Sequence, residues 1–289
     1  MATPEHGSSA ARSDTNSDSV FLEAEAGQVW QRGAAVRGQA FGSATELMLN
    51  LAGLTPGSRV LDVAAGTGEQ TLVAARRVGP AGQVLATDIS VGMLAIATEE
   101  AKKAKLTNVE TRVMDAQRLD LESASFDAVI SRMGVMLVPD HHAALAEIHR
   151  VLKPGGKLAV IVWSTPERNL YVLLPSLIAR RHANLPPLAS GQAGMFSLGW
   201  PGMLEQVLAE ARFRHVMVQA VPAPRRFASV GAMIDLLTGS SPLLSEALAL
   251  LDEGAKVAML TEIEHTMRQF EGADGVEIAG EVLVGAGVK

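Results

Sequence analysis

The sequence predicts an α/β protein built on a doubly wound, mostly parallel sheet. Short, continuous apolar runs alternate with segments of helical periodicity between residues 59 and 163. Continuous apolar runs are typical of strands that helices cover on both faces. Strands and helices that alternate at this spacing are typical of a parallel sheet. The length of 289 residues allows one large domain or two small ones, and it is ample for a buried core.

Helices are expected before the alternating region. Apolar and small residues recur at helical spacing over residues 20–39, with Trp30 among the larger ones. A further helix is expected over 43–51, where Ser43 can act as the N-cap and Glu46 completes a capping box. In the alternating region, strands are expected over 59–64, 83–87, 109–113, 126–131 and 157–163, and helices over 69–78, 90–103 and 141–151.

The rhythm changes beyond residue 163, where a Pro/Gly-rich connector, "NLPPLASGQAGMFSLGWPG", interrupts the pattern. Helices are expected over 171–183, 202–211, 233–237, 243–251 and 256–270, and strands over 214–221 and 276–288. The chain therefore divides into a disordered tail (1–19), an N-terminal helical cap (20–52), a ligand-binding core (53–166), a helical lid with its connector (167–212), and a segment that completes the sheet with inserted helices (213–289).

Composition excludes several classes of function. The formal net charge is −6 and no run of basic residues is longer than a pair, which argues against a nucleic-acid partner. Because the chain has no cysteine, disulfides, thiolate catalysis and cysteine-bound metals are excluded. The polar first residues do not resemble a signal peptide, and no apolar run reaches the ~18 residues that a membrane span needs. A soluble, cytoplasmic protein without membrane contact is expected.

The stretch "RVLDVAAGTGEQTLVAARRVGPAGQVLATDIS" places a glycine turn between a buried strand and a helix. A dinucleotide fingerprint needs a third glycine where this chain has Thr71, and Glu69 at the helix N-terminus would repel a pyrophosphate. Asp62, inside the strand, suits a cationic group, and Asp88 fits a ribose diol. The stretch therefore favours a ribose-bearing, phosphate-free, cationic cofactor over a nicotinamide dinucleotide.

These residues resemble a known family. "VLDVAAGTGEQT" resembles motif I of the class I S-adenosylmethionine-dependent methyltransferases, and "VLATDIS", "VMDAQRL", "FDAVISRMGVMLVPD" and "ALAEIHRVLKPGGKL" resemble the motifs that follow it. The arrangement is most similar to the ubiquinone/menaquinone-type small-molecule methyltransferase group, and it covers residues 47–163. The resemblance implies a Rossmann-like, seven-stranded sheet whose antiparallel C-terminal strand is "EVLVGAGVK". It also implies that residues 53–166 bind S-adenosylmethionine.

The resemblance implies a role for single residues around the methionine part of the cofactor. Asp62 would anchor the ammonium group, directly or through water, and Ser131 would face the methionine from the end of the fourth strand. Trp30 would close over the cofactor from the N-terminal helix. The turn residues that would bind through the glycine loop are Ala64, Gly66, Thr67 and Gly68.

Around the adenosine part, the resemblance implies five further contacts. Asp88 would accept hydrogen bonds from both ribose hydroxyls, and Ile89 and Met93 would pack on the adenine. Asp115 would accept a hydrogen bond from the adenine amino group, while the backbone of Ala116 would donate to the ring.

Simpler roles remain open for some of these residues. Asp62 can cap the glycine turn, and Asp88 can belong to the N-cap of the helix that follows it. Asp115 can be an ordinary turn acid, and Met93 can be an ordinary packing residue.

His141 and His142 are the candidates for a general base, because they begin a helix at the carboxyl edge of the sheet, where ligands bind. Methyl transfer can also proceed without a dedicated base, and polar residues at a helix start are usually solvated. No pair of histidines has metal-ligand spacing with a carboxylate nearby, so no metal is expected.

The function expected from this reasoning is methyl transfer from S-adenosylmethionine to a small, largely apolar acceptor. O-methylation in natural-product biosynthesis is the first expectation. The alternatives are C- or N-methylation of a quinone-like or amine acceptor, or a non-methylating reaction such as cyclisation. A homodimer is left open. The aromatic residues available for a roof over the acceptor are Trp163, Tyr171, Phe196, Trp200 and Phe227.

Overall fold

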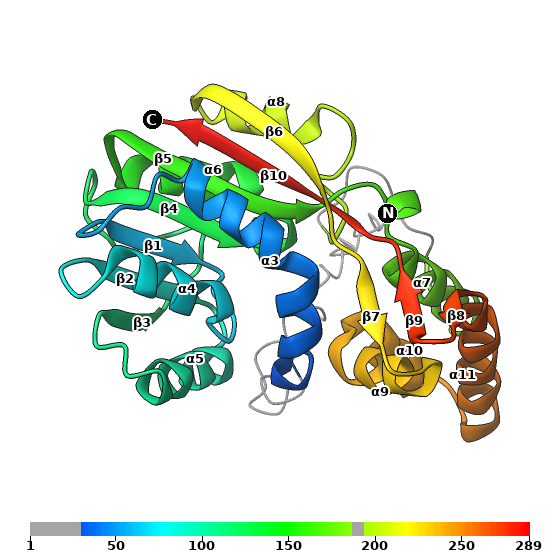
Figure 1. Cartoon of the computed structure of the whole chain (residues 1–289). Coiled ribbons are helices and arrows are strands. Elements are labelled where there is room, and N and C mark those ends of the chain that lie inside the picture. The colour runs from blue at the N-terminus through cyan, green and yellow to red at the C-terminus, as the bar shows by residue number, and fades with distance from the viewer. Residues whose placement is uncertain (1–29, 187–193) are drawn as a thin grey trace, which may run out of the picture.

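The computed structural model describes residues 30–186 and 194–289. Its centre is a seven-stranded sheet (Figure 1). The strand order is β3-β2-β1-β4-β5-β10-β6. Strands β1 to β5 pair in parallel, and β10 pairs antiparallel with both β5 and β6. The strands are β1 Arg59–Val63, β2 Gln83–Asp88, β3 Val109–Val113, β4 Phe126–Arg132, β5 Leu152–Trp163, β6 Arg214–Pro222 and β10 Glu281–Val288. The doubly wound, mostly parallel sheet with an antiparallel C-terminal strand is confirmed.

Helices cover this sheet, which is why its central strands are mostly apolar and buried. Helices α4 and α5 pack against β1 to β3, α6 packs against β5, and α8 packs against β6 and β10. Their bounds are α4 Glu69–Val78, α5 Val91–Lys103, α6 His141–Val151 and α8 Met203–Glu210. Val60, Leu61 and Val129 are completely buried, and Asp62 is the polar residue in the middle of this apolar region.

Helix α3, Ala34–Leu51, crosses the sheet and contacts β5, β10 and β7. The sequence predicted a new helix beginning at Ser43, and this is wrong: Ser43 lies exposed inside one continuous helix. The reason is packing, because Phe41, Ala44 and Met48 continue one buried stripe through the expected break.

The lid of this protein, defined here as residues 170–182 and 225–278, has a hydrophobic core of its own. Helices α7, α9, α10 and α11 surround a three-stranded sheet of order β7-β9-β8. Ile178, Met233, Met259, Ile263 and Met267 are among its buried residues. The elements are α7 Leu170–His182, α9 Val230–Ser240, α10 Pro242–Leu250, α11 Glu253–Met267, β7 Arg225–Phe227, β8 Glu271–Gly272 and β9 Gly275–Ile278.

The lid lies beyond the carboxyl ends of β4 and β5 (Figure 1), and three short chain segments connect it directly to strands of the sheet, while residues 183–202 lead from α7 to α8. One follows β5, and the other two join β6 to β7 and β9 to β10. The sequence predicted one strand over 276–288, but the chain forms β9 and β10 with a break at Ala279 and Gly280. Short 3-10 turns complete the fold at Val135–Leu137, Pro166–Arg168 and Arg268–Phe270.

Within residues 30–186 and 194–289, none of the helices combines the length and the apolar character that crossing a bilayer requires. The tail predicted for residues 1–19, most of the helix predicted over 20–39 and part of the Pro/Gly-rich connector lie outside the described residues.

Gly280 marks the point where the two sheets separate, and we expect Gly280→Ala to destabilise the protein. A Cβ there would lie 2.4 Å from the carbonyl oxygen of Ala223, whose N–H donates to the Gly280 carbonyl oxygen. Backbone atoms cannot move aside cheaply, so we expect a loss of about 1–3 kcal/mol in the free energy of unfolding, measured by urea denaturation.

Gly38→Ala is the matched control for this prediction, because a Cβ at Gly38 of α3 would meet nothing within 4 Å. Replacing a glycine inside a helix should raise the free energy of unfolding by up to about 1 kcal/mol. Equal stability of the two alanine variants would contradict the argument.

Candidate functional site

The candidate site lies at the carboxyl ends of β1 and β4, where the strand order of the parallel sheet reverses. Two residues without glycine's freedom have left-handed backbones here: Ala64 after β1 (φ 54°) and Met133 after β4 (φ 63°). The strand ends are so close that a Cβ on Gly134 would lie 2.3 Å from the Cβ of Ala64. Strained backbone at the switch point of an α/β sheet is typical of a ligand-binding edge.

The glycine turn after β1 has two left-handed glycines with different tasks. Gly68 (φ 82°) begins α4, and a Cβ there would lie 2.8 Å from the Cβ of Ala97 in α5. At Gly66 (φ 58°), a Cβ would have no neighbour within 4 Å except Nε1 of Trp30, at 4.0 Å. Gly68 therefore lets α4 and α5 pack closely, whereas Gly66 leaves the turn accessible beside Trp30. Thr67, between them, is buried.

Trp30 lies beside this turn and over an arginine of α3. The guanidinium carbon of Arg37 is 4.3 Å from the centroid of the Trp30 ring, a cation–π contact that fixes the indole. The structure thus brings Trp30 to the glycine turn, and its contact with a cofactor stays a prediction.

Asp62 is completely buried and is held by side chains of α4. Its two carboxylate oxygens accept hydrogen bonds from the Thr71 hydroxyl (2.5 Å) and the Gln70 amide (3.1 Å). Burial raises the pKa of Asp62 to about 7, although both hydrogen bonds favour the ionised form. Thr71, which the sequence showed only as the replacement for a third glycine, is therefore the direct partner of this acid. The carboxylate of Asp62 therefore binds side chains of α4 and does not cap the glycine turn.

Asp88, at the end of β2, connects the glycine turn to α5. One carboxylate oxygen accepts from the backbone N–H of Gly66 at 2.8 Å, and the other accepts from the N–H of Ser90 at 2.9 Å. Ser90 is the N-cap of α5, so the expected part of Asp88 in that cap is present. Burial raises the pKa of this carboxyl despite the N–H donors. Each oxygen keeps a lone pair for a further donor, and the ribose contact stays a prediction.

The residues predicted for the adenine differ in their accessibility. Ile89 has 39 % of its surface exposed directly beside Asp88, whereas Met93 and Ala116 are buried. The Asp115 carboxylate accepts from the backbone N–H (2.9 Å) and the side-chain amide (3.0 Å) of Gln117, which is the turn role left open for it. Ile89 is therefore the residue that offers free apolar surface at this end, while Met93 packs inside.

Ser131, the penultimate residue of β4, is buried, and its hydroxyl has no hydrogen-bond partner in the described part of the chain. This oxygen lies 3.1 Å from the position that a Cβ of Gly134 would take, so it faces the crowded junction of β1 and β4. Buried hydroxyls are nearly always paired, and an unpaired one at a switch point fits a group that arrives with a ligand.

Glu69, the first residue of α4, forms ion pairs with two arginines from distant segments. Its carboxylate accepts from Arg37 of α3 and, at 2.5 Å, from Arg132 at the end of β4. Burial alone would raise the pKa of Glu69, but the charge of Arg132 and the hydrogen bonds from Arg37 outweigh it and lower the pKa. The sequence indicated only that Glu69 would repel a pyrophosphate, because nothing local relates it to residues 32 positions before or 63 positions after it.

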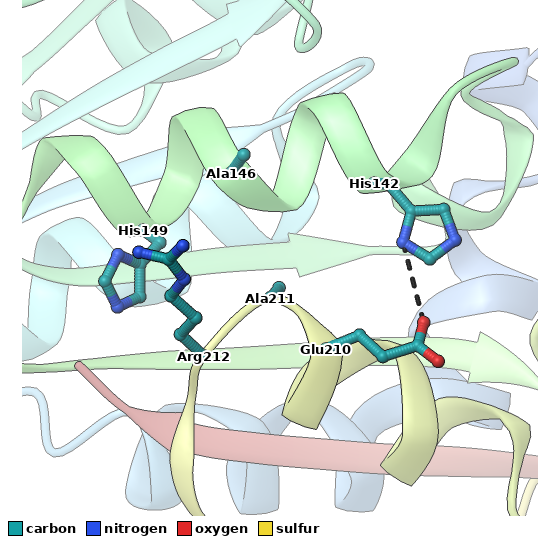
Figure 2. A pocket seen from close by; sticks show the side chains of 6 residues that line it. All are labelled: His142, Ala146, His149, Glu210, Ala211 and Arg212. Carbon is teal, nitrogen blue, oxygen red and sulfur yellow. Dashed lines mark ion pairs between the residues drawn. The ribbon is translucent and has the colours of Figure 1, made fainter.

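The two histidines proposed as a base lie at the start of α6. His142 faces Glu210 of α8, with 3.8 Å between the imidazole Nδ1 and the carboxylate, across a surface pocket (Figure 2). Burial and the neighbouring His142 lower the pKa of His141. The residues that line this pocket are His142, Ala146, His149, Glu210, Ala211 and Arg212, and none of them is among those predicted to hold the cofactor.

In residues 30–186 and 194–289, no three His, Asp or Glu side chains converge in a way that could hold a metal ion. That the protein uses no metal stays a prediction.

The raised pKa of Asp62 makes a testable prediction about stability. The folded protein keeps a proton on this group up to about pH 7, whereas the unfolded chain loses it near the ordinary value of 3.8. The folded protein is therefore most stable, as far as Asp62 is concerned, below pH 3.8, where the group is protonated in both states. Its free energy of unfolding falls as the pH rises from there towards 7, because only the unfolded chain gives up the proton. Between pH 5 and 7 the wild type should lose up to about 1.4 kcal/mol of unfolding free energy per pH unit relative to Asp62→Asn.

Urea denaturation of both proteins at several pH values measures this difference, and all other titrating groups cancel because the two proteins share them. Parallel stability curves would show that Asp62 titrates alike in the folded and unfolded states.

Comparisons with known proteins agree with this geometry. The family model described as "Methyltransferase domain" matches residues 60–156. The chain is 42% identical over 123 residues to the ubiquinone/menaquinone biosynthesis C-methyltransferase UbiE of Teredinibacter turnerae, which is 42% of this chain and 49% of that protein. It is 43% identical over 110 residues to the demethylmenaquinone methyltransferase of Listeria welshimeri, which is 38% of this chain and 47% of that protein. The chain thus spans about half the length of these curated relatives.

Among solved structures, the YcgJ protein of Bacillus subtilis shares the fold with a TM-score of 0.58 and 17% identity, covering 86% of this chain and 98% of that one. The cyclase SpnF shares it with a TM-score of 0.53 and 21% identity, covering 86% and 81%. At these identities the structures show the fold alone. Together with the sheet order and the glycine turn, the matched domain and its relatives show that residues 60–156 form a methyltransferase domain similar to that of the ubiquinone/menaquinone-type S-adenosylmethionine-dependent methyltransferases.

Proposed function

We propose that this protein transfers a methyl group from S-adenosylmethionine to a small-molecule acceptor. The observation that carries the proposal is the accessible turn at Gly66, with Asp88 bound to its N–H and the unpaired Ser131 hydroxyl at the neighbouring strand end. These groups fit the cofactor: hydroxyl groups of a ribose suit Asp88, and a flat apolar ring suits the exposed side chain of Ile89.

Asp62 contributes to cofactor binding as a positioning residue. Since it is completely buried and both oxygens are bound to Thr71 and Gln70, we assign it to the placement of the first turn of α4 and not to direct contact. Backbone groups of Ala64, Gly66 and Gly68 would hold the methionine part, with Trp30 beside them. The bound cofactor supplies an electrophilic methyl group on a sulfonium.

The work left to the protein is to align the acceptor with that methyl group and to exclude water. The proposal therefore needs no metal and assigns no general base; His142 lines a surface pocket, 3.8 Å from the Glu210 carboxylate, that none of the residues assigned to the cofactor lines. The homodimer and the cytoplasmic location expected from the sequence stay predictions.

The acceptor is decided outside the region that defines the family. The domain match ends at residue 156, whereas the lid begins at Leu170. The curated relatives are named C-methyltransferases of quinone biosynthesis or demethylmenaquinone methyltransferases, which favours carbon over the oxygen expected from the sequence. We therefore propose a carbon of a quinol-like ring as the first acceptor to test and a ring oxygen as the second. Cyclisation has only the shared fold of SpnF in its favour.

Asp88→Ala tests the cofactor site. Loss of hydrogen bonds to a charged group costs about 1.5–3 kcal/mol, so S-adenosylhomocysteine should bind at least tenfold more weakly, as measured by calorimetry. Asp235→Ala, which removes an exposed acid of α9, is the control and should bind like the wild type. Binding of NAD by the wild type in place of S-adenosylhomocysteine would refute the proposal.

Transfer itself is tested with methyl-labelled S-adenosylmethionine and a panel of quinols, phenols and amines. We expect label in an aromatic product together with an equal amount of S-adenosylhomocysteine. Conversion of an acceptor without consumption of the methyl donor would show instead that the cofactor has a structural role and that the reaction is of another class.

A further inference from the structure

Arg225, the first residue of β7, is a buried guanidinium without a counter-ion. Only 6% of its surface is exposed, and its Nε has no hydrogen-bond partner. Across the described ranges of the chain, no carboxylate forms an ion pair with it. Buried charges are ordinarily paired, because removing an ion from water costs several kcal/mol. An unpaired one therefore calls for an explanation.

Three aromatic rings surround this guanidinium, and each comes from a different element. Its central carbon lies 4.5 Å from the ring centroid of Phe41 in α3, 5.2 Å from Trp163 in β5 and 5.4 Å from Tyr171 in α7. The faces of the rings attract the positive charge, but they supply no acceptor for the N–H groups at the edge of the guanidinium. The rings therefore stabilise the cation and leave its hydrogen-bonding capacity unused.

The charges nearby increase the need for an anion. Arg37 and Arg132 already share the single carboxylate of Glu69. With Arg225 the group carries three positive charges and one negative charge. Burial, together with the charges of Arg37 and Arg132, lowers the pKa of Arg225 to about 10, yet the side chain stays protonated at neutral pH. The cluster thus has an excess of positive charge at its lid end.

This end of the cluster lies one aromatic ring away from the cofactor site. The Phe41 ring that contacts Arg225 is also 5.8 Å from the guanidinium carbon of Arg132. Arg132 directly follows Ser131 in β4 and binds Glu69, the residue after the glycine turn. Arg225 therefore stands on the lid side of the same site, where an acceptor has to lie.

We propose that Arg225 binds an oxyanion of the acceptor, so that the substrate is a planar ring bearing a carboxylate or an ionised hydroxyl. The inference rests on the proposed function and names its substrate class. The fork of a guanidinium matches a carboxylate with two parallel N–H···O bonds. The Tyr171 ring, 5.4 Å from the same guanidinium carbon, carries a further hydrogen-bond donor, and burial raises the pKa of its hydroxyl to about 12.

Calorimetry on the full chain saturated with S-adenosylhomocysteine tests the proposal with 2-naphthoate and its neutral counterpart 2-naphthamide. The wild type should bind the carboxylate at least tenfold more tightly than the amide. Arg225→Met should remove this preference and leave the affinity for S-adenosylhomocysteine unchanged. Arg226→Met is the matched control, because the neighbouring arginine of β7 is exposed and paired with Glu277; it should keep the preference.

The two sources of the oxyanion are separated with 4-nitrophenol, whose hydroxyl ionises near neutral pH, well below the pKa of about 10 of Arg225. Tighter binding to the wild type, but not to Arg225→Met, as the pH rises and the hydroxyl ionises would identify a phenolate. A preference for naphthoate without that pH dependence would identify a carboxylate. Both results support the proposal.

Equal affinity of the wild type for naphthoate and naphthamide would overturn the inference, as would an Arg225→Met variant that keeps the preference. If Arg225→Met does not fold, Arg225→Lys replaces it: it keeps the charge, loses the fork, and should reduce the preference. Failure of the wild type to bind S-adenosylhomocysteine would refute the proposed function itself. Normal cofactor binding without a preference for the anion would refute only the role of Arg225.

Discussion

The carboxylate of Glu69 stands between two guanidinium groups, and the geometry of the whole carboxyl edge follows from that arrangement. Arg37 belongs to α3, Arg132 ends β4, and Glu69 opens α4, so one acid joins three elements that are far apart in the chain. The side chains of both arginines are less than 10% exposed. In such an environment either arginine without Glu69 would be an uncompensated buried charge. We therefore expect a substitution of any one of the three residues to destabilise the protein.

Fixing α3 in this way positions both ends of the site. Arg37 supports the ring of Trp30, which lies beside Gly66 at the cofactor end. One turn further along the helix, Phe41 packs edge-on against Trp163, with 5.5 Å between the ring centroids, and reaches Arg225. Under the proposed function, this single helix outside the matched domain would supply one wall to the methyl donor and another to the acceptor.

The parallel sheet could be predicted from the sequence because each strand is a local apolar run and each turn has its own glycines. The glycine turn between β1 and α4 followed from the same stretch. The hydrogen bond from Thr71 to Asp62 could not be predicted, because it depends on the direction of a helix side chain nine residues further along the chain. The same holds for Arg225: strand β7 has three residues, too few for a periodic pattern, and every ring around its guanidinium comes from a distant segment.

Under the proposed function, the separate core of the lid would let the acceptor surface vary independently of the cofactor site. A sulfonium methyl group needs alignment more than it needs an acid or a base, so the cofactor half can stay the same while the acceptor changes. Here the lid packs around its own apolar residues, and three short segments join it to strands of the sheet while residues 183–202 lead to α8. If the lid carries the acceptor surface, as proposed, substitutions there would alter that surface without disturbing the core around β1 and β4. Arg225 is the exception. It belongs to the lid, but it contacts the same Phe41 ring as Arg132 of the sheet. The charge that the proposal assigns to the acceptor site therefore depends on the lid and on the sheet.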